Sequence, residues 1–373
     1  MRKRIRLKQL LGRGLQMGSN GCWVNELSEY SLPALEAELS AAGFKSSHAA
    51  GMLRAFYQAD GRPAWPQSRL PDALKRLLAG RAQPEELAAR QVAEDGTTKL
   101  LLRLGDGRTV ESVLMPDYRP DRAAGCISSQ VGCAMGCDFC ATTKTGFERN
   151  LTAGEIIRQF LALRREAAAV GRKLQTIVFM GMGEPMLNLD AVLAAIDRMA
   201  PNELGALGWR QITVSTVGIV PGIDALAASG RNVHLAVSLH APDDATRARL
   251  LPIGKRFEVE SILAAADRYQ ARTGRPVSLQ YCLLAGVNDS LEQARLLAAL
   301  LAGRRMHVNL LRYNPTGISL RGETYAATAD DQADRFMALL RGEGVVAHFR
   351  RSRGKEIDAA CGQLRRRTIA ATP

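Results

Sequence analysis

The chain has 373 residues, 46% of them hydrophobic and 23% charged, and its net charge is +13. This composition is globular, and the length predicts two or three domains or one barrel with an appendage. No apolar run approaches the roughly 18 residues that span a bilayer, and the basic N-terminus lacks the features of a secretory signal. We therefore expect a cytoplasmic protein with no membrane partner, whose cysteines are ligands or reactive groups rather than a disulfide framework.

The positive charge is concentrated at the two ends of the chain. Residues 1–13 carry six basic and no acidic side chains, and residues 341–373 carry eight basic and three acidic ones. Clustered positive charge favours a polyanionic partner, and nucleic acid is the first candidate. The alternative is a solvated, solubilising tail at each end.

Residues 25–90 are predicted to be helical. In the first helix Ser31 is the expected cap, Pro33 lies in the first turn and Gly43 follows the end. Two apolar runs around Gly105-Asp106-Gly107 then predict a β-hairpin. We assign residues 1–92 to a helical accessory domain and residues 93–120 to a β-hairpin linker.

From Cys126 onward, strand-like apolar runs alternate with helical stretches. The runs cover residues 126–132, 176–182, 211–216, 234–240, 277–284, 307–314 and 345–350. Thr152 and Glu155 predict a capping box at the start of the first helix. About six such units predict an α/β fold, with a parallel sheet curled into a partial (β/α)6 barrel over residues 121–350. A doubly wound sheet is the alternative, although no Gly-x-Gly-x-x-Gly follows the first strand.

Three cysteines, Cys133, Cys137 and Cys140, lie within eight residues at the expected end of the first strand. Thiolate ligands select zinc, copper(I) or iron–sulfur. Zinc normally takes a second pair of ligands, and no second Cys/His pair with such spacing occurs in the chain. A cubane can instead be held by three cysteines, which leaves one iron open to a chelating substrate. Three buried cysteines without a ligand are the structural alternative.

This spacing, on a first strand followed by further βα units, resembles the radical S-adenosylmethionine (SAM) superfamily. The resemblance implies a 4Fe-4S iron–sulfur cluster whose open iron binds SAM and splits it into methionine and a 5′-deoxyadenosyl radical. The run "MGMGEP" (180–185) resembles the superfamily's Gly-Glu-Pro motif, which implies that Gly183 and Glu184 bind the amino group of SAM. Strand-end positions that resemble its SAM contacts are Ser215, Ser238, Leu239, His240 and Asn314.

Three further stretches resemble the RlmN/Cfr adenine methyltransferases: "CISSQVGCAMGCDFCATTKTGF", "STVGIVP" with "LAVSLHAP", and "EIDAACGQL". The resemblance covers roughly residues 95–367 and implies methylation of an adenine ring carbon in 23S ribosomal RNA. It implies that Cys361 takes a methyl group from one SAM and that a second SAM yields the radical that activates this methyl. Cys126 is implied to release the RNA by forming a disulfide with Cys361. Glu111 is implied as a proton acceptor or an adenine contact.

Several alternatives stay open at this level. RlmN-type enzymes act on carbon 2 and also on transfer RNA, whereas Cfr-type enzymes act on carbon 8 and confer antibiotic resistance; "RSRGKEIDAACGQL" favours the RlmN type. A zinc-stabilised RNA-binding protein without catalysis is the alternative from another class.

The RNA contacts and partners are predicted from charge and from the same resemblance. We expect the accessory domain to contact RNA. We also expect that an electron donor such as flavodoxin reduces the protein and that the protein is a monomer. The basic C-terminal segment, residues 351–373, carries Cys361. The side chains near it that suit phosphate binding are Arg350, Arg351, Arg353, Arg365, Arg366 and Arg367. The target adenine must leave its stack to reach Cys361.

Overall fold

The computed structural model describes residues 26–78, 80–82, 85–350 and 363–365. The chain divides into two compact units, Met1–Pro84 and Glu85–Pro373. Among the described residues, no helix has both the length and the apolar character needed to cross a membrane.

The first unit is built from short helices around an apolar centre. They are α2 (Leu32–Ala41), α3 (His48–Gln58) and α4 (Asp72–Leu78), with the 3-10 turns η1 (Leu27–Glu29) and η2 (Trp65–Gln67). The side chain of Ser31 accepts a hydrogen bond from the Ala34 N–H, so the expected cap of α2 is confirmed. Gly43 follows the helix with a φ of +80°, a conformation that glycine adopts without strain.

The second unit contains a ten-stranded sheet with the order β1-β2-β3-β4-β7-β8-β9-β10-β11-β12. The first four strands pair antiparallel, and β4 and all later strands pair parallel. The bounds are β1 (Glu86–Val92), β2 (Thr98–Arg103), β3 (Thr109–Pro116), β4 (Arg122–Cys126), β7 (Lys173–Phe179), β8 (Ile212–Thr216), β9 (His234–Ser238), β10 (Val277–Leu283), β11 (Met306–Arg312) and β12 (Val346–Phe349). A separate pair joins β5 (Gln130–Gly132) to β6 (Phe147–Asn150).

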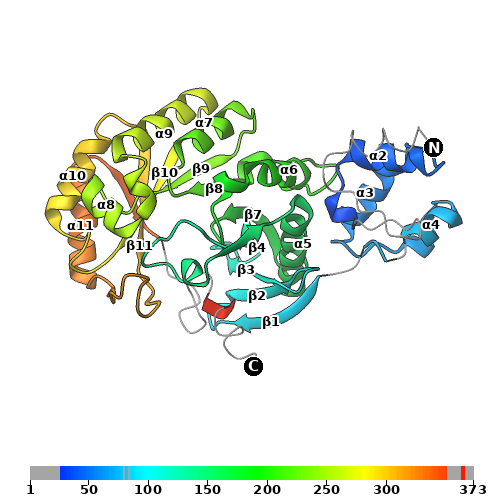
Figure 1. The fold of residues 1–373 in the computed structure, drawn as a ribbon, viewed down its shortest axis with the longest axis horizontal. Coiled ribbons are helices and arrows are strands. Elements are labelled where there is room, and N and C mark those ends of the chain that lie inside the picture. Colours follow the sequence, from blue (N-terminus) through cyan, green and yellow to red (C-terminus); the bar gives the residue numbers. More distant parts are fainter. Residues whose placement is uncertain (1–25, 79, 83–84, 351–362, 366–373) are drawn as a thin grey trace. The chain divides into compact units, whose positions relative to one another are not determined.

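The parallel strands lie in the sheet in the same order as in the chain, so every crossover steps in one direction. A doubly wound sheet would reverse its order once, and the partial barrel is therefore the correct prediction. Figure 1 shows the sheet curving, with α7, α9 and α10 on its outer side. The connecting helices are α5 (Ala153–Ala169), α6 (Leu189–Met199), α7 (Val220–Ala228), α8 (Asp244–Leu250), α9 (Val259–Thr273), α10 (Leu291–Leu301) and α11 (Asp330–Gly342).

Two expected elements differ from the structure. Residues 86–92 were assigned to the helical segment but form β1, because pairing with β2 overrides the helical preference of the run ELAARQV. The expected strand 126–132 is divided, since β4 ends at Cys126 and β5 starts at Gln130. Ser128 lies between the two, where its N–H donates to Gln159 and its hydroxyl to the Glu111 carbonyl, so its polar groups are satisfied outside the sheet ladder. The hairpin at Gly105–Gly107 is confirmed as the β2–β3 pair.

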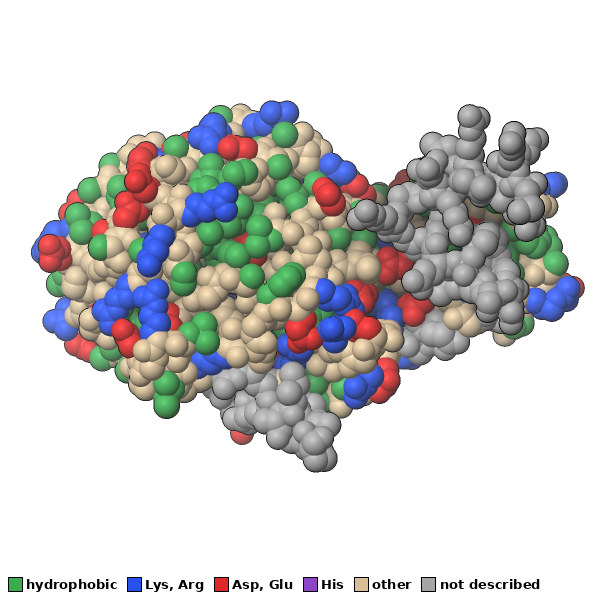
Figure 2. Space-filling model, viewed as in Figure 1, with side chains coloured by type: hydrophobic (Ala, Val, Ile, Leu, Met, Phe, Trp, Pro, Cys, Tyr) green, Lys and Arg blue, Asp and Glu red, His purple; other side chains and the backbone are tan. Residues whose placement is uncertain are grey.

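The surface charge of the described residues is mixed. On the face shown in Figure 2, Lys and Arg side chains are interspersed with Asp and Glu rather than gathered in one patch. Residues 1–13 and most of the basic C-terminal segment lie outside the described residues. The nucleic-acid partner expected from clustered charge at the two ends therefore stays a prediction at this level.

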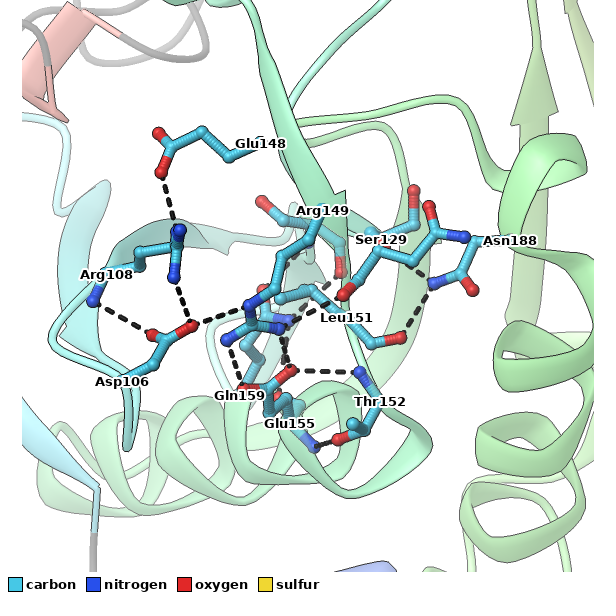
Figure 3. Close-up of polar contacts among 12 residues, drawn as sticks. Asp106, Arg108, Ser129, Glu148, Arg149, Leu151, Thr152, Glu155, Gln159 and Asn188 are labelled. Carbon is cyan, nitrogen blue, oxygen red and sulfur yellow. Dashed lines mark hydrogen bonds and ion pairs between the residues drawn. The ribbon is translucent and has the colours of Figure 1, made fainter. Parts of the chain in front are cut away.

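An ionic network joins the hairpin turn to the start of α5 (Figure 3). The guanidinium of Arg149, on β6, donates to Asp106 at 2.7 Å and to both oxygens of Glu155 at 2.7 and 2.8 Å. Thr152 and Glu155 form the expected capping box. Because Arg149 contacts both the β2–β3 turn and the first turn of α5, it fixes the small β5–β6 sheet from which the cysteine loop begins.

Candidate active site at the carboxyl ends of the parallel strands

A cavity of about 630 Å³ opens at the carboxyl ends of the parallel strands. This is the edge of a barrel at which ligands bind, because the loops that follow the strands meet there. Residues at or just after the end of each parallel strand line the cavity: Cys126 (β4), Met180 (β7), Ser215 (β8), Ser238 (β9), Cys282 (β10), Asn314 (β11) and Arg350 (β12).

The three cysteines of the motif all line this cavity, in the loop that follows β5. Cys133 and Cys137 are buried, Cys140 is partly buried, and none of the three forms a disulfide. The backbone of the loop is held in place, since Cys133 donates its N–H to the Gly146 carbonyl at 2.9 Å and the Thr143 hydroxyl bonds to the carbonyls of Cys137 and Cys140 at 3.0 Å. The loop therefore presents three sulfur atoms to one space.

The chemistry of these thiols fits an iron–sulfur cluster. Burial raises the pKa of Cys133 to about 12 and that of Cys137 well above its usual range, so these thiols do not ionise without a positive partner. Iron supplies that charge and takes thiolate ligands. Among the residues that the structure describes, no three His, Cys, Asp or Glu side chains converge on one metal ion. A cubane bonds each thiolate to a different iron and does not need such convergence.

Glu184 presents a buried carboxylate to the same cavity. Its two oxygens accept hydrogen bonds from the N–H groups of Met186 at 3.0 Å and Val217 at 2.8 Å. Burial raises its pKa to about 7. A ligand ammonium group would shift the carboxylate toward its charged form, so Glu184 is suited to accept hydrogen bonds from an amine.

Gly183, next to this carboxylate, lines the cavity and has a φ of +101°. A Cβ there would lie 2.6 Å from the Cβ of Gln130, too close for any side chain. The Gln130 side chain accepts the Glu184 N–H at 2.8 Å. Gly183 thus allows the close approach that orients Glu184.

His240 lines the cavity with a strained backbone, since its φ is +60°. Its Nδ1 accepts the Cys282 N–H at 3.0 Å, and its ring lies edge-on to Phe139 at 5.0 Å. Burial lowers its pKa to about 3, so the ring is neutral at physiological pH. Asn288 donates to the carbonyls of His240 and Cys282 at 2.7 Å and holds this arrangement. No sequence motif indicates Asn288, whose only signal is an amide in the turn after β10.

Of the other expected SAM contacts, three line the cavity and one does not. Ser215, Ser238 and Asn314 line the cavity, whereas Leu239 does not. Leu239 is fully buried and donates its N–H to the Gln280 carbonyl, so its side chain belongs to the core.

Glu111, on β3, is not among the residues that line the cavity, although Val113 and Met115, on the same face of that strand, do line it. Its buried carboxylate is 3.2 Å from Nζ of Lys99 on β2 and accepts the Arg365 N–H at 2.8 Å. Lys99 does line the cavity and is also buried. Sequence reasoning missed Lys99, because a lysine within a strand usually faces solvent.

The described part of the C-terminal segment, residues 363–365, contacts four residues elsewhere in the second unit. Gln363 donates to the Pro315 carbonyl at 3.1 Å, and the Arg365 N–H bonds to Glu111. The Arg365 guanidinium pairs with Glu148 and donates to the Thr145 hydroxyl at 3.3 Å. Arg365 is only 3% exposed, so in this structure its charge is directed to the protein and not to solvent. The other predicted positions here lie outside the described residues: Cys361, Arg351, Arg353, Arg366 and Arg367.

The chain is similar to known proteins over nearly its whole length. A model of the Radical SAM superfamily matches residues 127–298. The chain is 65% identical over 345 residues to a "Probable dual-specificity RNA methyltransferase RlmN 1" of Opitutus terrae, covering 91% of this chain and 96% of the relative. It is 43% identical over 357 residues to a protein of that kind from Rhodopirellula baltica, covering 93% and 92%. A crystal structure of a radical SAM methyltransferase from Sphaerobacter thermophilus superposes with a TM-score of 0.84 at 41% identity, covering 91% and 99%.

These relatives exclude the non-catalytic zinc protein. Since the similarity includes the Radical SAM region and extends over most of the chain, the cofactors are a 4Fe-4S cluster and SAM. The chain belongs to the RlmN family of radical SAM RNA methyltransferases.

Proposed function

We propose that this enzyme methylates carbon 2 of an adenine in 23S ribosomal RNA, and in transfer RNA as a second substrate, through a methylated cysteine. One observation carries the proposal: Cys126 lines the same cavity as Cys133, Cys137, Cys140 and Glu184. A thiol that resolves a protein–RNA bond has to lie where the cofactor and the substrate meet, and the position of Cys126 in this cavity supports such a role.

In this proposal the chain's own residues bind and orient the cofactors. Cys133, Cys137 and Cys140 hold the cluster, and Glu184 accepts the ammonium group of SAM. Ser215, Ser238, His240 and Asn314 offer further polar contacts at the strand ends. When bound, the cluster and SAM supply the radical that activates the methyl group.

Cys361 and Cys126 carry the methyl group and release it. The Cys361 thiolate takes a methyl group from SAM by displacement, and the activated methyl carbon bonds to the adenine ring carbon. That carbon gives up its hydrogen as a proton, and the unpaired electron of the adduct returns to the cofactors. The Cys126 thiolate then attacks the Cys361 sulfur; the bond from that sulfur to the methylene carbon breaks, a disulfide forms, and the carbon takes a proton to become the methyl group. A thiol reductant restores both cysteines.

Contacts of the C-terminal segment support this role of Cys361. Gln363 follows Cys361 by two residues in the sequence and bonds to the Pro315 carbonyl, beside the cavity residues Asn314 and Thr316. We propose Glu111 as the proton acceptor. Its ion-pair partner Lys99 lines the cavity, so a proton route from the base to Glu111 passes this lysine.

The test is the position of the methyl group. Anaerobically reconstituted enzyme is given SAM, a reductant and unmodified ribosomal RNA or transfer RNA, and the nucleosides are separated by mass spectrometry. We expect 2-methyladenosine from both RNAs. Production of 8-methyladenosine would show the Cfr-type reaction instead, and no methylated adenine in either RNA would overturn the proposal.

The proposed partners follow from this reaction. With ribosomal RNA as substrate, the enzyme acts in the cytoplasm. A flavodoxin-type protein donates the electron there. The enzyme acts as a monomer. Replacing the chemical reductant by flavodoxin and its reductase in the same assay tests the donor. Absence of turnover with flavodoxin, with turnover under the chemical reductant, would refute it.

A further inference from the structure

Arg247, on α8, has the largest of the fully buried side chains in the described part of the protein, with 0% exposure. Its guanidinium donates to two backbone carbonyls, those of Phe257 at 3.3 Å and Val217. Its Nε has no hydrogen-bond partner, and among the described residues no carboxylate is paired with it in direct contact; Cys137 and Asp244 act on its charge through space. A buried cation without a directly paired anion is costly, so its presence needs a reason.

The position of Arg247 connects it to the cysteine loop. Leu250, one turn further along α8, accepts the N–H of Asp138, the residue that follows Cys137, at 2.9 Å. Leu250 and Val217 both pack in the apolar cluster that contains Cys137. Arg247 does not line the cavity. It lies behind the wall that carries Cys137, where it cannot contact a substrate directly.

Val217 connects the same guanidinium to Glu184. Its carbonyl accepts from Arg247, and its N–H donates to the Glu184 carboxylate at 2.8 Å. The loop after β8 is thus held between a buried cation and the carboxylate proposed to bind SAM. Arg247 remains protonated at neutral pH, since burial lowers its pKa only to about 10.

We infer that Arg247 is the buried counter-charge of the iron–sulfur cluster and makes its one-electron reduction easier. Three thiolates bring negative charge to this wall, and reduction adds one more electron without forming or breaking a bond. Net charge near a cluster is one of the features that set its reduction potential. A positive charge in a buried, low-dielectric position stabilises the reduced form more than the oxidised form. The inference rests on the proposed role of the three cysteines.

The test is a redox titration of the reconstituted full chain without SAM, followed by electron paramagnetic resonance, with dithionite as the reductant. Arg247→Met removes the charge and keeps an unbranched apolar side chain. We expect the equilibrium constant for cluster reduction to fall about tenfold or more. For a one-electron couple, a tenfold fall makes the reduction potential about 59 mV more negative. The matched control is Arg249→Met on the same helix, whose partly exposed side chain pairs with Glu323 at 2.8 Å; its potential should equal that of the wild type.

An unchanged potential in Arg247→Met, with a wild-type iron content, would overturn the inference. If Arg247→Met binds no cluster, Arg247→Lys decides the question. A cluster in the lysine variant would support the need for a positive charge. Loss of the cluster in both variants would overturn the inference in favour of a purely geometric role for Arg247. Failure of the cysteine assignment is distinguishable, because the wild-type chain itself would then bind no iron; failure of the carbon-2 reaction would appear in the nucleoside assay and leave the redox titration unaffected.

Discussion

At the scale of single residues, the cavity shows how burial sets protonation. Glu184 and His240 both line it and are buried, and burial moves their pKa values in opposite directions, to about 7 and to about 3. Both shifts favour the neutral form of the side chain. The protein therefore contributes little charge of its own at these two positions. The charged groups at this site are therefore expected to come from the cofactors, and the protonation of Glu184 then depends on the ammonium group that it binds.

Loss of Cys133 should remove the cluster. In Cys133→Ala one of three thiolate ligands is gone, so we expect reconstituted protein to lose its brown colour and most of its iron. Iron and sulfide analysis measures this. Cys282→Ala is the matched control, since Cys282 is also a buried cysteine that lines the cavity but lies outside the motif. Equal iron in wild type and Cys133→Ala would contradict the ligand assignment.

Loss of Cys126 should trap the RNA on the protein. Without the resolving thiol, the bond between Cys361 and the adenine has no partner to break it. Denaturing electrophoresis of Cys126→Ala after one turnover should show a covalent RNA–protein adduct, which Cys361→Ala in the same chain abolishes. Normal release of methylated RNA by Cys126→Ala would remove the resolving role.

His240 should make stability depend on pH. Because its folded pKa of about 3 lies below the usual 6.5, the unfolded chain binds more protons between these values, and stability falls as pH drops below 6.5. From pH 6.5 to 5 the loss is about 2 kcal/mol for this group. In His240→Gln this contribution is absent. Between pH 6.5 and 5, urea unfolding should therefore show that the free energy of unfolding falls by about 2 kcal/mol more in the wild type than in the variant. Parallel pH profiles of the two proteins would contradict this.

At the scale of elements, the ends of strands and the loops after them decide the site. The β2–β3 hairpin supplies Lys99 and Glu111, and β6 supplies Glu148; two of these three contact residues 363–365. The β2–β3 hairpin and the separate β5–β6 pair thus form the surface on which the described C-terminal residues dock. Their contacts join positions more than 200 residues apart in the chain.

Weakening this docking should slow methylation of Cys361. Glu148→Gln removes the charge opposite the buried Arg365 guanidinium. We expect a roughly tenfold lower rate of Cys361 methylation by SAM, or about 1.4 kcal/mol, because a charged hydrogen bond that is partly screened contributes about this much. Mass spectrometry of the peptide that contains Cys361 measures it.

Glu86→Gln is the control for this experiment. It removes an exposed ion pair with Arg103 on the ten-stranded sheet, away from residues 363–365, and should leave the rate unchanged. An unaltered rate in Glu148→Gln would show that the Arg365 contact does not position the segment.

At the scale of the whole molecule, we expect the two units to have different tasks. All residues that line the cavity belong to the unit Glu85–Pro373. The described residues of the first unit contribute none of them, so the contact of the N-terminal helical region with RNA stays a prediction.

Removal of the first unit should therefore uncouple cofactor chemistry from RNA methylation. The fragment 85–373, which is a compact unit by itself, is expected to bind iron and to cleave SAM under a reductant at rates close to those of the full chain. Its methylation of ribosomal RNA should fall by at least about a hundredfold, since the RNA contacts of the first unit are lost. Wild-type RNA methylation by the fragment would refute the role of this unit.

The sequence by itself determined the features that depend on local spacing. The three cysteines within eight residues, the capping box at Thr152 and the turn at Gly105–Gly107 are short-range patterns, and the alternation of strands with helices predicted the parallel sheet. Gly183 and Glu184 belong to one turn, so their motif could be read as a unit. Such short-range patterns can be read from the sequence because backbone geometry and hydrophobic periodicity act over a few residues.

Only the tertiary structure decided which distant side chains share a site. Lys99, Asn288 and Arg247 are unremarkable in the sequence, but folding buries each of them against the cavity wall or the cysteine loop. The same pairing across the sheet turned residues 86–92 from the expected helix into strand β1 and brought Glu111 to Lys99, which lines the cavity. Burial and long-range pairing are properties of the packed chain, which is why no local pattern contains them.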